Sequence, residues 1–215
     1  MSLHLWAIRH GEVAAPYVGA FVGTFDVDLS PLGRHQAAAA AAYLKDAPLD
    51  AIVASPRRRA QNTAAPLAKE TGLQVETRDG FGEMDFGRWE GLHWPDIEQA
   101  DPDFAARWAA DPATIPCPDG ESTDSFAARV HAAFEALHDE FQGRHVALFA
   151  HAGVNRALLS HALGRPYLET FAFAQDYGCL NALHYGDAGA GAQIALLNLV
   201  PGPRSAEQGD GAPEA

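Results

Sequence analysis

The chain has 215 residues, of which 47% are apolar and 20% are charged, and it contains 20 glycines. This size and composition predict one compact domain with a substantial core. The formal net charge of −13 argues against nucleic-acid binding, because a phosphate backbone would meet a mostly repulsive surface. No apolar run approaches the roughly 18 residues that a membrane helix needs, and residues 1–10 lack the pattern of a secretory signal. We therefore expect a cytoplasmic protein without membrane contact, and nothing in the sequence indicates an oligomeric state.

The cysteines and the basic residues narrow the chemistry further. Cys117 and Cys179 do not have CxxC spacing, so we expect reduced thiols rather than a disulfide framework. Of 15 basic residues only Lys45 and Lys69 are lysines. Arginine offers a planar fork of donors that suits phosphate oxygens, so an anionic substrate could still find local positive charge. A genome that prefers arginine codons is the alternative explanation.

Three short apolar runs predict buried strands, and each is followed by a segment with helical character. The strands are predicted over residues 3–8, 51–54 and 146–150, and the helices over residues 31–46, 56–71 and 155–163. Proline opens the second helix, and glycine closes the second and the third. This alternation predicts an α/β fold, a three-layer sandwich in which helices cover both faces of a mostly parallel sheet.

The remaining segments complete a predicted domain over residues 1–200. They are a short strand at 73–77, an amphipathic helix at 122–142, and a closing hairpin of residues 180–185 and 193–200 across the glycine-rich turn 186–191. Residues 201–215 are rich in Pro, Gly, Glu and Ala, which predicts a disordered tail.

Residues 80–121 interrupt the alternating pattern. Trp89, Trp94, Phe104 and Trp108 lie here among glycines, prolines and acidic residues. We interpret the segment as a small helical insertion that covers something, as a lid does. A surface helix pair that buries its tryptophans in its own small core is an equally good interpretation, and the two are compatible.

Reactive residues follow each of the three predicted parallel strands. Arg9 and His10 follow the first, Ser55 and the arginine run 57–59 follow the second, and His151 follows the third. Ligands bind outside the carboxyl ends of such strands, so strand order brings these residues to one rim. A single histidine at a strand end is more often a hydrogen-bonded structural residue. Two histidines together with several arginines favour a site.

Phosphoryl transfer suits this rim. The transferred group carries charge on three equatorial oxygens, so fixed cations must surround it while a nucleophile attacks in line. A neutral imidazole can attack and form a phosphoramidate that water later hydrolyses. The leaving alkoxide needs a proton, and the region of Glu83, just after the strand at 73–77, can supply a carboxylic acid.

Six segments in this order resemble the histidine phosphatase superfamily, which is phosphoglycerate-mutase-like. The resemblance spans about residues 3–200 and is closest to the small bacterial branch of alpha-ribazole phosphatases and fructose-bisphosphatase-like enzymes. The segments are Arg9-His10-Gly11, residues 28–33 (DLSPLG), 55–64 (SPRRRAQNTA), 83–91 (EMDFGRWEG), 118–122 (PDGES) and 151–156 (HAGVNR).

The resemblance implies a metal-independent phosphatase that uses no cofactor and hydrolyses small phosphomonoesters through a phosphohistidine. It implies that His10 is the nucleophile and that Glu83 is the proton donor. It also implies that Arg9, Arg59 and His151 bind the phosphoryl group. Alpha-ribazole phosphate and sugar phosphates are both candidate substrates.

Two further positions are expected to contribute to binding. Gly153 is small enough for its backbone N–H to approach a ligand, as in a phosphate loop. Many relatives carry an asparagine that helps to hold phosphate soon after the signature tripeptide, whereas here Glu12 is followed by Val-Ala-Ala-Pro. Thr24, or backbone amides of residues 19–26, are candidates to replace that contact.

Other functions remain open at this point. Phosphoglycerate mutases of the family are usually longer and carry a His-Gly-Asn type motif where this chain has His151-Ala152-Gly153-Val154, which favours a phosphatase. A metal-dependent hydrolase is disfavoured, because the chain has neither HExxH nor His-x-His. A silent phospholigand-binding protein on the same scaffold is a third alternative. A P-loop enzyme is excluded, because neither lysine follows a glycine-rich turn.

Overall fold

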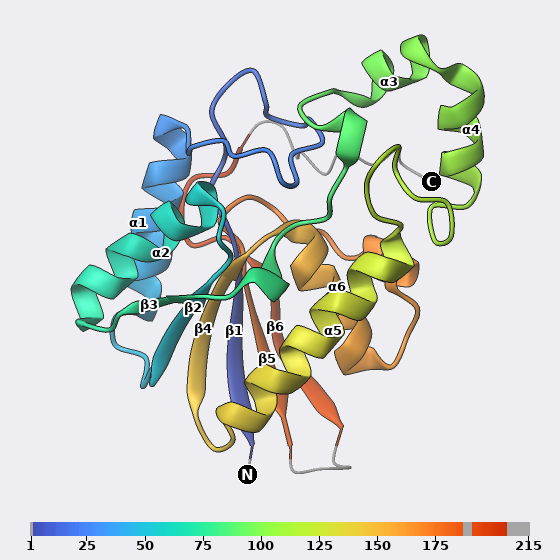
Figure 1. Cartoon of the computed structure of the whole chain (residues 1–215). Coiled ribbons are helices and arrows are strands. Elements are labelled where there is room, and N and C mark those ends of the chain that lie inside the picture. Colours follow the sequence, from blue (N-terminus) through green and yellow to red (C-terminus); the bar gives the residue numbers. More distant parts are fainter. Residues whose placement is uncertain (1, 187–190, 206–215) are drawn as a thin grey trace.

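The computed structural model describes residues 2–186 and 191–205, and in this part of the chain a six-stranded sheet lies between two layers of helices (Figure 1). The strand order is β3-β2-β4-β1-β5-β6. The pairs β3–β2, β2–β4 and β4–β1 are parallel, whereas β5 and β6 are antiparallel to their neighbours. The strands are β1 (Leu3–Arg9), β2 (Ala51–Ala54), β3 (Val75–Thr77), β4 (His145–Ala150), β5 (Leu180–Tyr185) and β6 (Ala192–Leu199).

Helices cover both faces of this sheet, which confirms the predicted three-layer α/β fold. Helices α1 and α2 lie on one face and α5 and α6 on the other (Figure 1). The helices are α1 (Pro31–Leu44), α2 (Arg58–Thr71), α3 (Trp94–Ala100), α4 (Pro102–Ala110), α5 (Thr123–Glu140) and α6 (Ala152–Leu163), with short 3₁₀ helices η1 (Asp79–Phe81), η2 (Gly87–Trp89) and η3 (Tyr167–Ala172). None of the described helices is both long and apolar enough to cross a membrane.

Local capping explains most of the helix boundaries. Ser30 caps α1 by accepting the backbone N–H of Gly33 at 2.9 Å, and Ser122 caps α5 in the same way. Helix α2 begins two residues later than predicted, at Arg58, because residue 57 has an extended backbone. Helix α6 begins three residues earlier than predicted, directly after β4. Its first turn therefore lies at the rim of the sheet.

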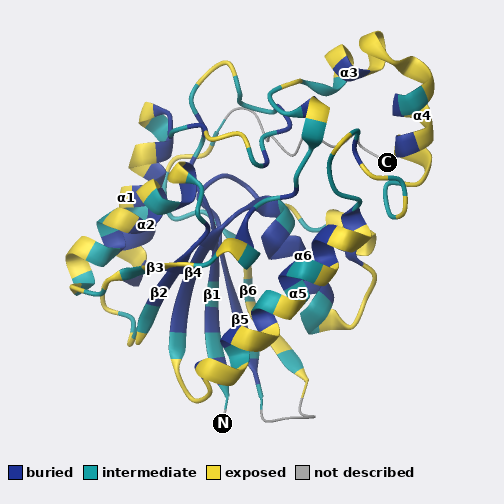
Figure 2. Ribbon diagram, in the orientation of Figure 1, coloured by how far each residue is buried: buried dark blue, intermediate teal, exposed yellow. Residues whose placement is uncertain are grey.

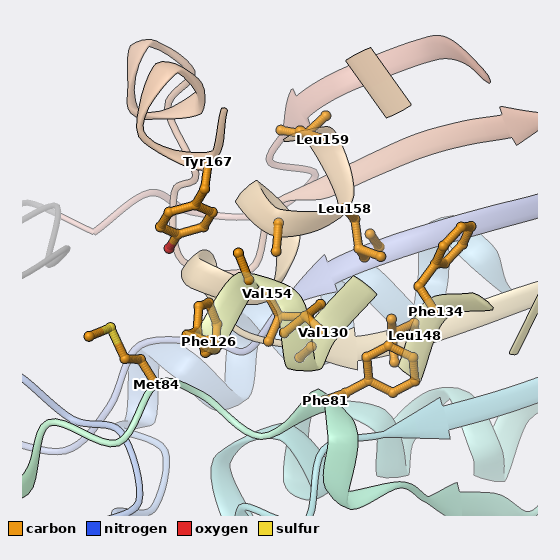
Figure 3. Packing of buried hydrophobic residues seen from close by; sticks show 14 of the residues in the cluster. Phe81, Met84, Phe126, Val130, Phe134, Leu148, Val154, Leu158, Leu159 and Tyr167 are labelled. Atoms are coloured by element: carbon orange, nitrogen blue, oxygen red, sulfur yellow. The ribbon is translucent and has the colours of Figure 1, made fainter. Parts of the chain in front are cut away.

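Each face of the sheet has its own hydrophobic core (Figure 2). On the side of α1 and α2, alanines and Leu44 pack against the sheet. On the other side, Phe81, Phe126 and Phe134 pack with aliphatic residues of α5, α6 and β4 (Figure 3). Full burial of each such side chain stabilises the fold by about 1.5–3 kcal/mol. The two cores hold the four parallel strands from both sides and so define the rim.

The insertion at 80–121 buries its tryptophans in the core of the domain rather than in a separate core of its own, and its role as a lid stays a prediction. Trp89 and Trp108 are buried, and their rings lie 5.0 Å apart edge to face. Phe21, from the loop after β1, packs against both of these rings. These rings belong to the same core cluster as the residues of α5 and α6, and helices α3 and α4 lie beyond the rim of the sheet (Figure 1).

The C-terminal part of the chain contains the predicted hairpin of β5 and β6. Residues 187–190 of its predicted turn lie outside the described residues, as do residues 206–215 of the predicted tail. Residues 201–205, which we assigned to the disordered tail, make contacts with the domain. The Arg204 guanidinium lies 2.9 Å from the Asp176 carboxylate, and the Pro203 carbonyl accepts a hydrogen bond from Gln36.

Candidate active site

A narrow cavity opens where β1 ends and α6 begins. Its volume is about 70 Å³. Both polar groups and aromatic rings line it. The lining residues are Arg9, His10, Val13, Ala20, Phe21, Val22, Glu83, Met84, Phe86, Trp108, Thr123, Ala152, Gly153, Arg156, Tyr167, Phe171 and Tyr177.

His10 is held in one tautomer at the tip of β1. Its Nδ1 lies 2.7 Å from the Gly11 carbonyl oxygen. Because a carbonyl can only accept, Nδ1 carries the proton and Nε2 keeps its lone pair. The ring is 5% exposed, and burial together with Arg59 and Arg9 holds the pKa of His10 well below its ordinary value. The imidazole is therefore neutral at physiological pH, as a nucleophile must be.

Gly11 is required by close packing at this point. A Cβ added to it would lie 2.3 Å from the Gly33 carbonyl oxygen in the first turn of α1. The backbone after His10 can therefore approach α1 only because the signature tripeptide ends in glycine.

His151 lies beside His10, at the end of the neighbouring strand β4. The two ring centroids are 5.2 Å apart, edge to face. Nε2 of His151 lies 2.7 Å from the Ser55 hydroxyl oxygen, whereas its buried Nδ1 has no hydrogen-bond partner among the described residues. Burial, followed by Arg59 and His10, lowers the pKa of His151 well below its ordinary value. The three strand ends β1, β2 and β4 thus meet as predicted.

Arg9 is packed tightly under the cavity. It is 3% exposed, and its guanidinium donates to the backbone carbonyl of Gln175. The guanidinium carbon lies 3.8 Å from the centre of the Tyr177 ring, which is cation–π distance. Gln175 is in turn held by side-chain amides, because its Oε1 accepts from Asn155 at 3.0 Å and from Asn181 at 2.9 Å. This buried amide network ties Arg9 to α6 and β5.

Arg59 is fully buried in the first turn of α2. Its terminal nitrogens donate to the backbone carbonyls of Val22, Gly23 and Phe25 at 2.8–3.0 Å, and it is not among the residues that line the cavity. Burial lowers the pKa of Arg59 to about 10, with Glu83 acting in the opposite direction, so the guanidinium stays charged at neutral pH. Its buried Nε has no hydrogen-bond partner among the described residues.

Glu90 holds the loop that Arg59 contacts. Its carboxylate accepts the backbone N–H groups of Gly23, Thr24 and Phe25 at 2.7–3.2 Å. The loop is thus clamped from both sides, with its amides on Glu90 and its carbonyls on Arg59. Glu90 was not predicted as a functional residue, although it belongs to one of the family-like segments.

The same contacts correct the expectation for Thr24. Both its amide and its hydroxyl donate to Glu90, and Thr24 does not line the cavity. Its polar groups serve the loop and are not directed at a ligand in the cavity. We therefore leave Thr24 out of the proposed site.

Glu83 and Gly153 form a direct contact across the cavity. The Glu83 carboxyl accepts the Met84 N–H at 2.9 Å and the Gly153 N–H at 3.1 Å. A Cβ on Gly153 would lie 2.3 Å from Glu83 Oε1, so only glycine allows this approach. Gly153 was expected to present its N–H to a ligand, but here that N–H holds the carboxyl. Burial raises the pKa of Glu83, opposed by these two hydrogen bonds and by Arg59 and Arg9.

Several residues that line the cavity were not predicted from the sequence. Arg156 and the rings of Tyr167, Phe171 and Tyr177 line it, and none of them was proposed as a site residue. Arg156 belongs to the segment HAGVNR that carried part of the resemblance, but the two rings of η3 had no local signal. Among the described residues, no group of three or more His, Cys, Asp or Glu side chains is arranged to hold a metal ion.

Neutral histidines, buried arginines and a carboxyl of raised pKa lie together at one rim of an α/β fold, an arrangement that suits phosphoryl transfer. Known proteins similar to this chain agree with that class. The model of the histidine phosphatase superfamily (branch 1) matches residues 5–199. The chain is 31% identical over 182 residues to the adenosylcobalamin/alpha-ribazole phosphatase of Escherichia coli (strain K12), covering 84% of this chain and 89% of that protein.

Two other relatives extend the comparison. An acid phosphatase of Mycobacterium tuberculosis is 31% identical over 203 residues, covering 93% of this chain and 94% of that protein. The crystal structure of the alpha-ribazole phosphatase from Shigella flexneri superposes with a TM-score of 0.84 at 29% identity, covering 91% of this chain and 96% of that chain. The chain belongs to the histidine phosphatase superfamily, and it is a phosphatase that acts on small phosphate esters.

Proposed function

We propose that the protein hydrolyses small phosphomonoesters in two steps, with a phosphohistidine at His10 between them. The observation that carries this proposal is the fixed tautomer of His10, because the Gly11 carbonyl holds the proton on Nδ1 and leaves Nε2 able to attack phosphorus. His10 also lines the cavity, so a substrate can reach it.

The first step transfers the phosphoryl group to the enzyme. Nε2 of His10 forms a bond to phosphorus while the bond from phosphorus to the ester oxygen breaks. Burial raises the pKa of Glu83, which favours the protonated carboxyl, and in this form the carboxyl gives its proton to the departing oxygen. In the second step water attacks phosphorus, its proton passes to the Glu83 carboxylate, and the bond from phosphorus to Nε2 breaks.

Three groups are proposed to hold the phosphoryl oxygens. Arg9 lines the cavity beside His10 and is aligned by Gln175 and Tyr177. Nδ1 of His151 is buried. When the Ser55 hydroxyl donates to Nε2 of His151, Nδ1 carries the proton and can donate it to a phosphoryl oxygen. Arg59 contributes positive charge from behind, and its Nε–H is directed to no other group among the described residues.

The proposed substrates are small molecules such as alpha-ribazole phosphate or a sugar phosphate, and the net charge of −13 disfavours nucleic acid. Alpha-ribazole phosphate comes from the names of two relatives, and sugar phosphates come from the family resemblance. A cytoplasmic location is part of this proposal, supported by Cys117 and Cys179, which are free, buried thiols.

A phosphoenzyme-trapping experiment tests the mechanism. The wild type is mixed with a panel of phosphorylated metabolites in the presence of EDTA, quenched, and searched for phosphohistidine by mass spectrometry. We expect turnover and a label on His10, and we expect the variant His10→Ala to lose both. Unchanged turnover in His10→Ala would falsify the proposal. Phosphate exchange between glycerates without release of inorganic phosphate would favour a mutase instead.

A further inference from the structure

The proposed proton donor, Glu83, lies on an irregular part of the chain. Residues 82–86 belong to no helix or strand and connect η1 with η2. A general acid must lie within about 2.6–3.2 Å of the oxygen that it protonates. A side chain on an irregular segment keeps such a position only if contacts from outside the segment hold it. The contacts that hold this segment therefore decide how well Glu83 can act.

Arg129, on α5, binds the backbone of this segment. Its Nη1 donates to the carbonyl oxygens of Gly80 and Gly82, each at 3.1 Å. Its Nη2 donates to the carbonyl oxygen of Glu83 at 3.3 Å. The three carbonyls belong to four consecutive residues, so one planar guanidinium holds the chain where it enters Glu83.

Glu121 holds the chain on the other side of Glu83. Its carboxylate accepts two hydrogen bonds from Arg129, from Nε at 3.0 Å and from Nη2 at 2.8 Å. It also accepts the backbone N–H of Asp85 at 3.0 Å, and the Asp85 carbonyl accepts the backbone N–H of Glu121 at 2.8 Å. Burial acts to raise the pKa of Glu121, but these hydrogen bonds and the charge of Arg129 outweigh burial and lower that pKa. We call Arg129 and Glu121 the brace.

Helix α5 also supports the carboxyl end of Glu83. Phe126 lies one turn before Arg129, whose guanidinium carbon is 5.1 Å from the centre of the Phe126 ring. The ring packs against Gly153, where a Cβ would lie 3.1 Å from Phe126 Cζ. The N–H of Gly153 in turn holds the Glu83 carboxyl. Phe126 and Phe81 of η1 are fully buried in the same core cluster (Figure 3). One helix therefore supports both the backbone and the carboxyl of Glu83.

The brace acts on Glu83 through position rather than through charge. Burial, two backbone N–H groups, Arg59 and Arg9 shift the pKa of Glu83. Loss of the brace would leave these groups in place but would free the backbone on both sides of the carboxyl. A misplacement of about 1 Å can lower a rate by about a hundredfold.

We propose that Arg129 and Glu121 are positioning residues for the proton donor, because they hold residues 80–85 on α5 so that the Glu83 carboxyl meets the departing oxygen. This inference rests on the proposed function and adds two residues to it. Neither of them lines the cavity.

Two substrates that differ in their need for a proton test the inference. The leaving group of benzyl phosphate must be protonated, whereas that of 4-nitrophenyl phosphate needs no proton. In Arg129→Gln we expect kcat for benzyl phosphate to fall by about tenfold or more. We expect kcat for 4-nitrophenyl phosphate and KM for both esters to stay within about twofold, because the groups that bind the phosphoryl group are unchanged. Arg129→Lys, which keeps the charge without the planar fork, should retain part of the activity with benzyl phosphate. An equal loss of kcat with both esters would overturn the inference.

Arg78→Gln is the matched control. Arg78 is also a partly buried arginine that joins the segment after β3 to α5, since it lies 2.7 Å from Glu140. Its guanidinium carbon lies 5.4 Å from the centre of the Phe141 ring. We expect Arg78→Gln to lower the free energy of unfolding in urea, as Arg129→Gln does, but to leave the ratio of the two kcat values unchanged. The same change of ratio in both variants would mean that lost stability causes it, and the inference would be wrong.

The double variant Glu83→Gln with Arg129→Gln shows whether the brace acts through Glu83. It should lose no more activity with benzyl phosphate than Glu83→Gln alone, because the group that the brace positions is already absent. Losses that multiply would overturn the inference. If Arg129→Gln does not fold, Glu121→Gln provides the same test, because it keeps the shape of the side chain and weakens its pairing with Arg129. Its loss should be smaller but of the same kind.

The variant Glu83→Gln separates failure of the inference from failure of the proposed function. If Glu83→Gln lowers kcat for both esters equally, Glu83 is not the proton donor, and the proposed mechanism and this inference fall together. If Glu83→Gln shows the dependence on the leaving group and the brace variants do not, only this inference is overturned.

Discussion

Strands β1 and β4 each carry a histidine at both ends, and the two ends differ completely. At the start of the strands, His4 stacks on His145 with ring centroids 4.3 Å apart, and His184 of β5 lies 4.5 Å from His4. We call these three residues the outer cluster. Just beyond the other ends of the strands, His10 and His151 form the inner pair at the cavity.

The difference between them lies in their surroundings. The inner pair is buried, and the Gly11 carbonyl holds His10 in one tautomer. Burial lowers the pKa of both rings, and Arg59 and Arg9 lie close enough to lower it further. The outer cluster is partly exposed, and the pKa of His4 is lowered by burial and then by His145 and His184. Imidazoles on the same two strands therefore become suited to phosphoryl transfer only where water is excluded and fixed cations surround them.

The largest expected loss of activity comes from replacing His151, just beyond one end of β4. Replacing His145, at the other end of the same strand, is the matched control. His151→Ala removes the proposed phosphoryl contact, and kcat should fall by about a hundredfold to a thousandfold, as for loss of one donor to a transition state. His145→Ala makes the same truncation in the outer cluster and should leave kcat within about twofold. Steady-state kinetics with benzyl phosphate measure both.

A further variant separates a contact from a packing defect at this buried position. Asn at position 151 places an amide N–H near the place of Nδ1, so His151→Asn should recover part of the activity that His151→Ala loses. Equal losses in the two variants, with circular dichroism unchanged, would mean that His151 only fills space.

Carboxyl groups accompany both regions and sharpen the comparison. Glu83 lines the cavity, whereas Asp50 lies beside the outer cluster, where it accepts the backbone N–H of His145 at 2.8 Å. Glu83→Gln should lower kcat for benzyl phosphate by about a hundredfold, because the poor leaving group loses its proton donor. The loss should be much smaller with 4-nitrophenyl phosphate, whose leaving group needs no proton.

The pH profile provides the second readout of Glu83. The raised pKa keeps the carboxyl protonated above its ordinary range, so kcat for benzyl phosphate should fall as pH rises through that pKa. This limb should be absent in Glu83→Gln and present in the control Asp50→Asn. A limb that survives in Glu83→Gln would assign the proton donor to another group.

The comparison also explains which parts of the molecule could be predicted. Local pattern was sufficient for the strands, since apolar runs and the residues after them placed His10, Ser55 and His151 at one rim. The order of the strands in the sheet, β3-β2-β4-β1-β5-β6, was not predicted, because it depends on contacts between distant segments. The outer cluster has no such signal, because His4, His145 and His184 meet only through strand register.

Contacts between distant segments explain the errors within the site. The clamp of Glu90 on residues 23–25 joins segments more than 60 residues apart, and it occupies the polar groups of Thr24. Gly153 was expected to bring its N–H close to a ligand, whereas the group that this N–H contacts is the Glu83 carboxyl on another element. A single sequence shows that a residue is small or charged, whereas packing decides what it meets.

The smallest expected effect concerns stability, measured by urea unfolding at about pH 7 and about pH 5. The folded-state pKa values of His10 and His151 lie below their unfolded values, so the unfolded chain binds more protons on acidification. The contribution of the two rings to the free energy of unfolding is complete above the unfolded pKa. It is lost as pH falls below that pKa, by at most about 1.4 kcal/mol per pH unit for each ring. Glu83 acts in the opposite direction, because its pKa is raised.

The double variant His10→Asn with His151→Asn removes both inner rings. Because Glu83 is unchanged in this variant, the difference from the wild type isolates what the two histidines contribute to the pH dependence of the free energy of unfolding. The free energy of unfolding of this variant should fall less between these two pH values than that of the wild type. The pair His4→Asn with His145→Asn should follow the wild type more closely, because the outer cluster is less buried and water screens its charges. If both double variants follow the wild type equally, the pKa values of the inner rings are not lowered in the folded protein, and the argument that burial and the arginines keep His10 neutral fails.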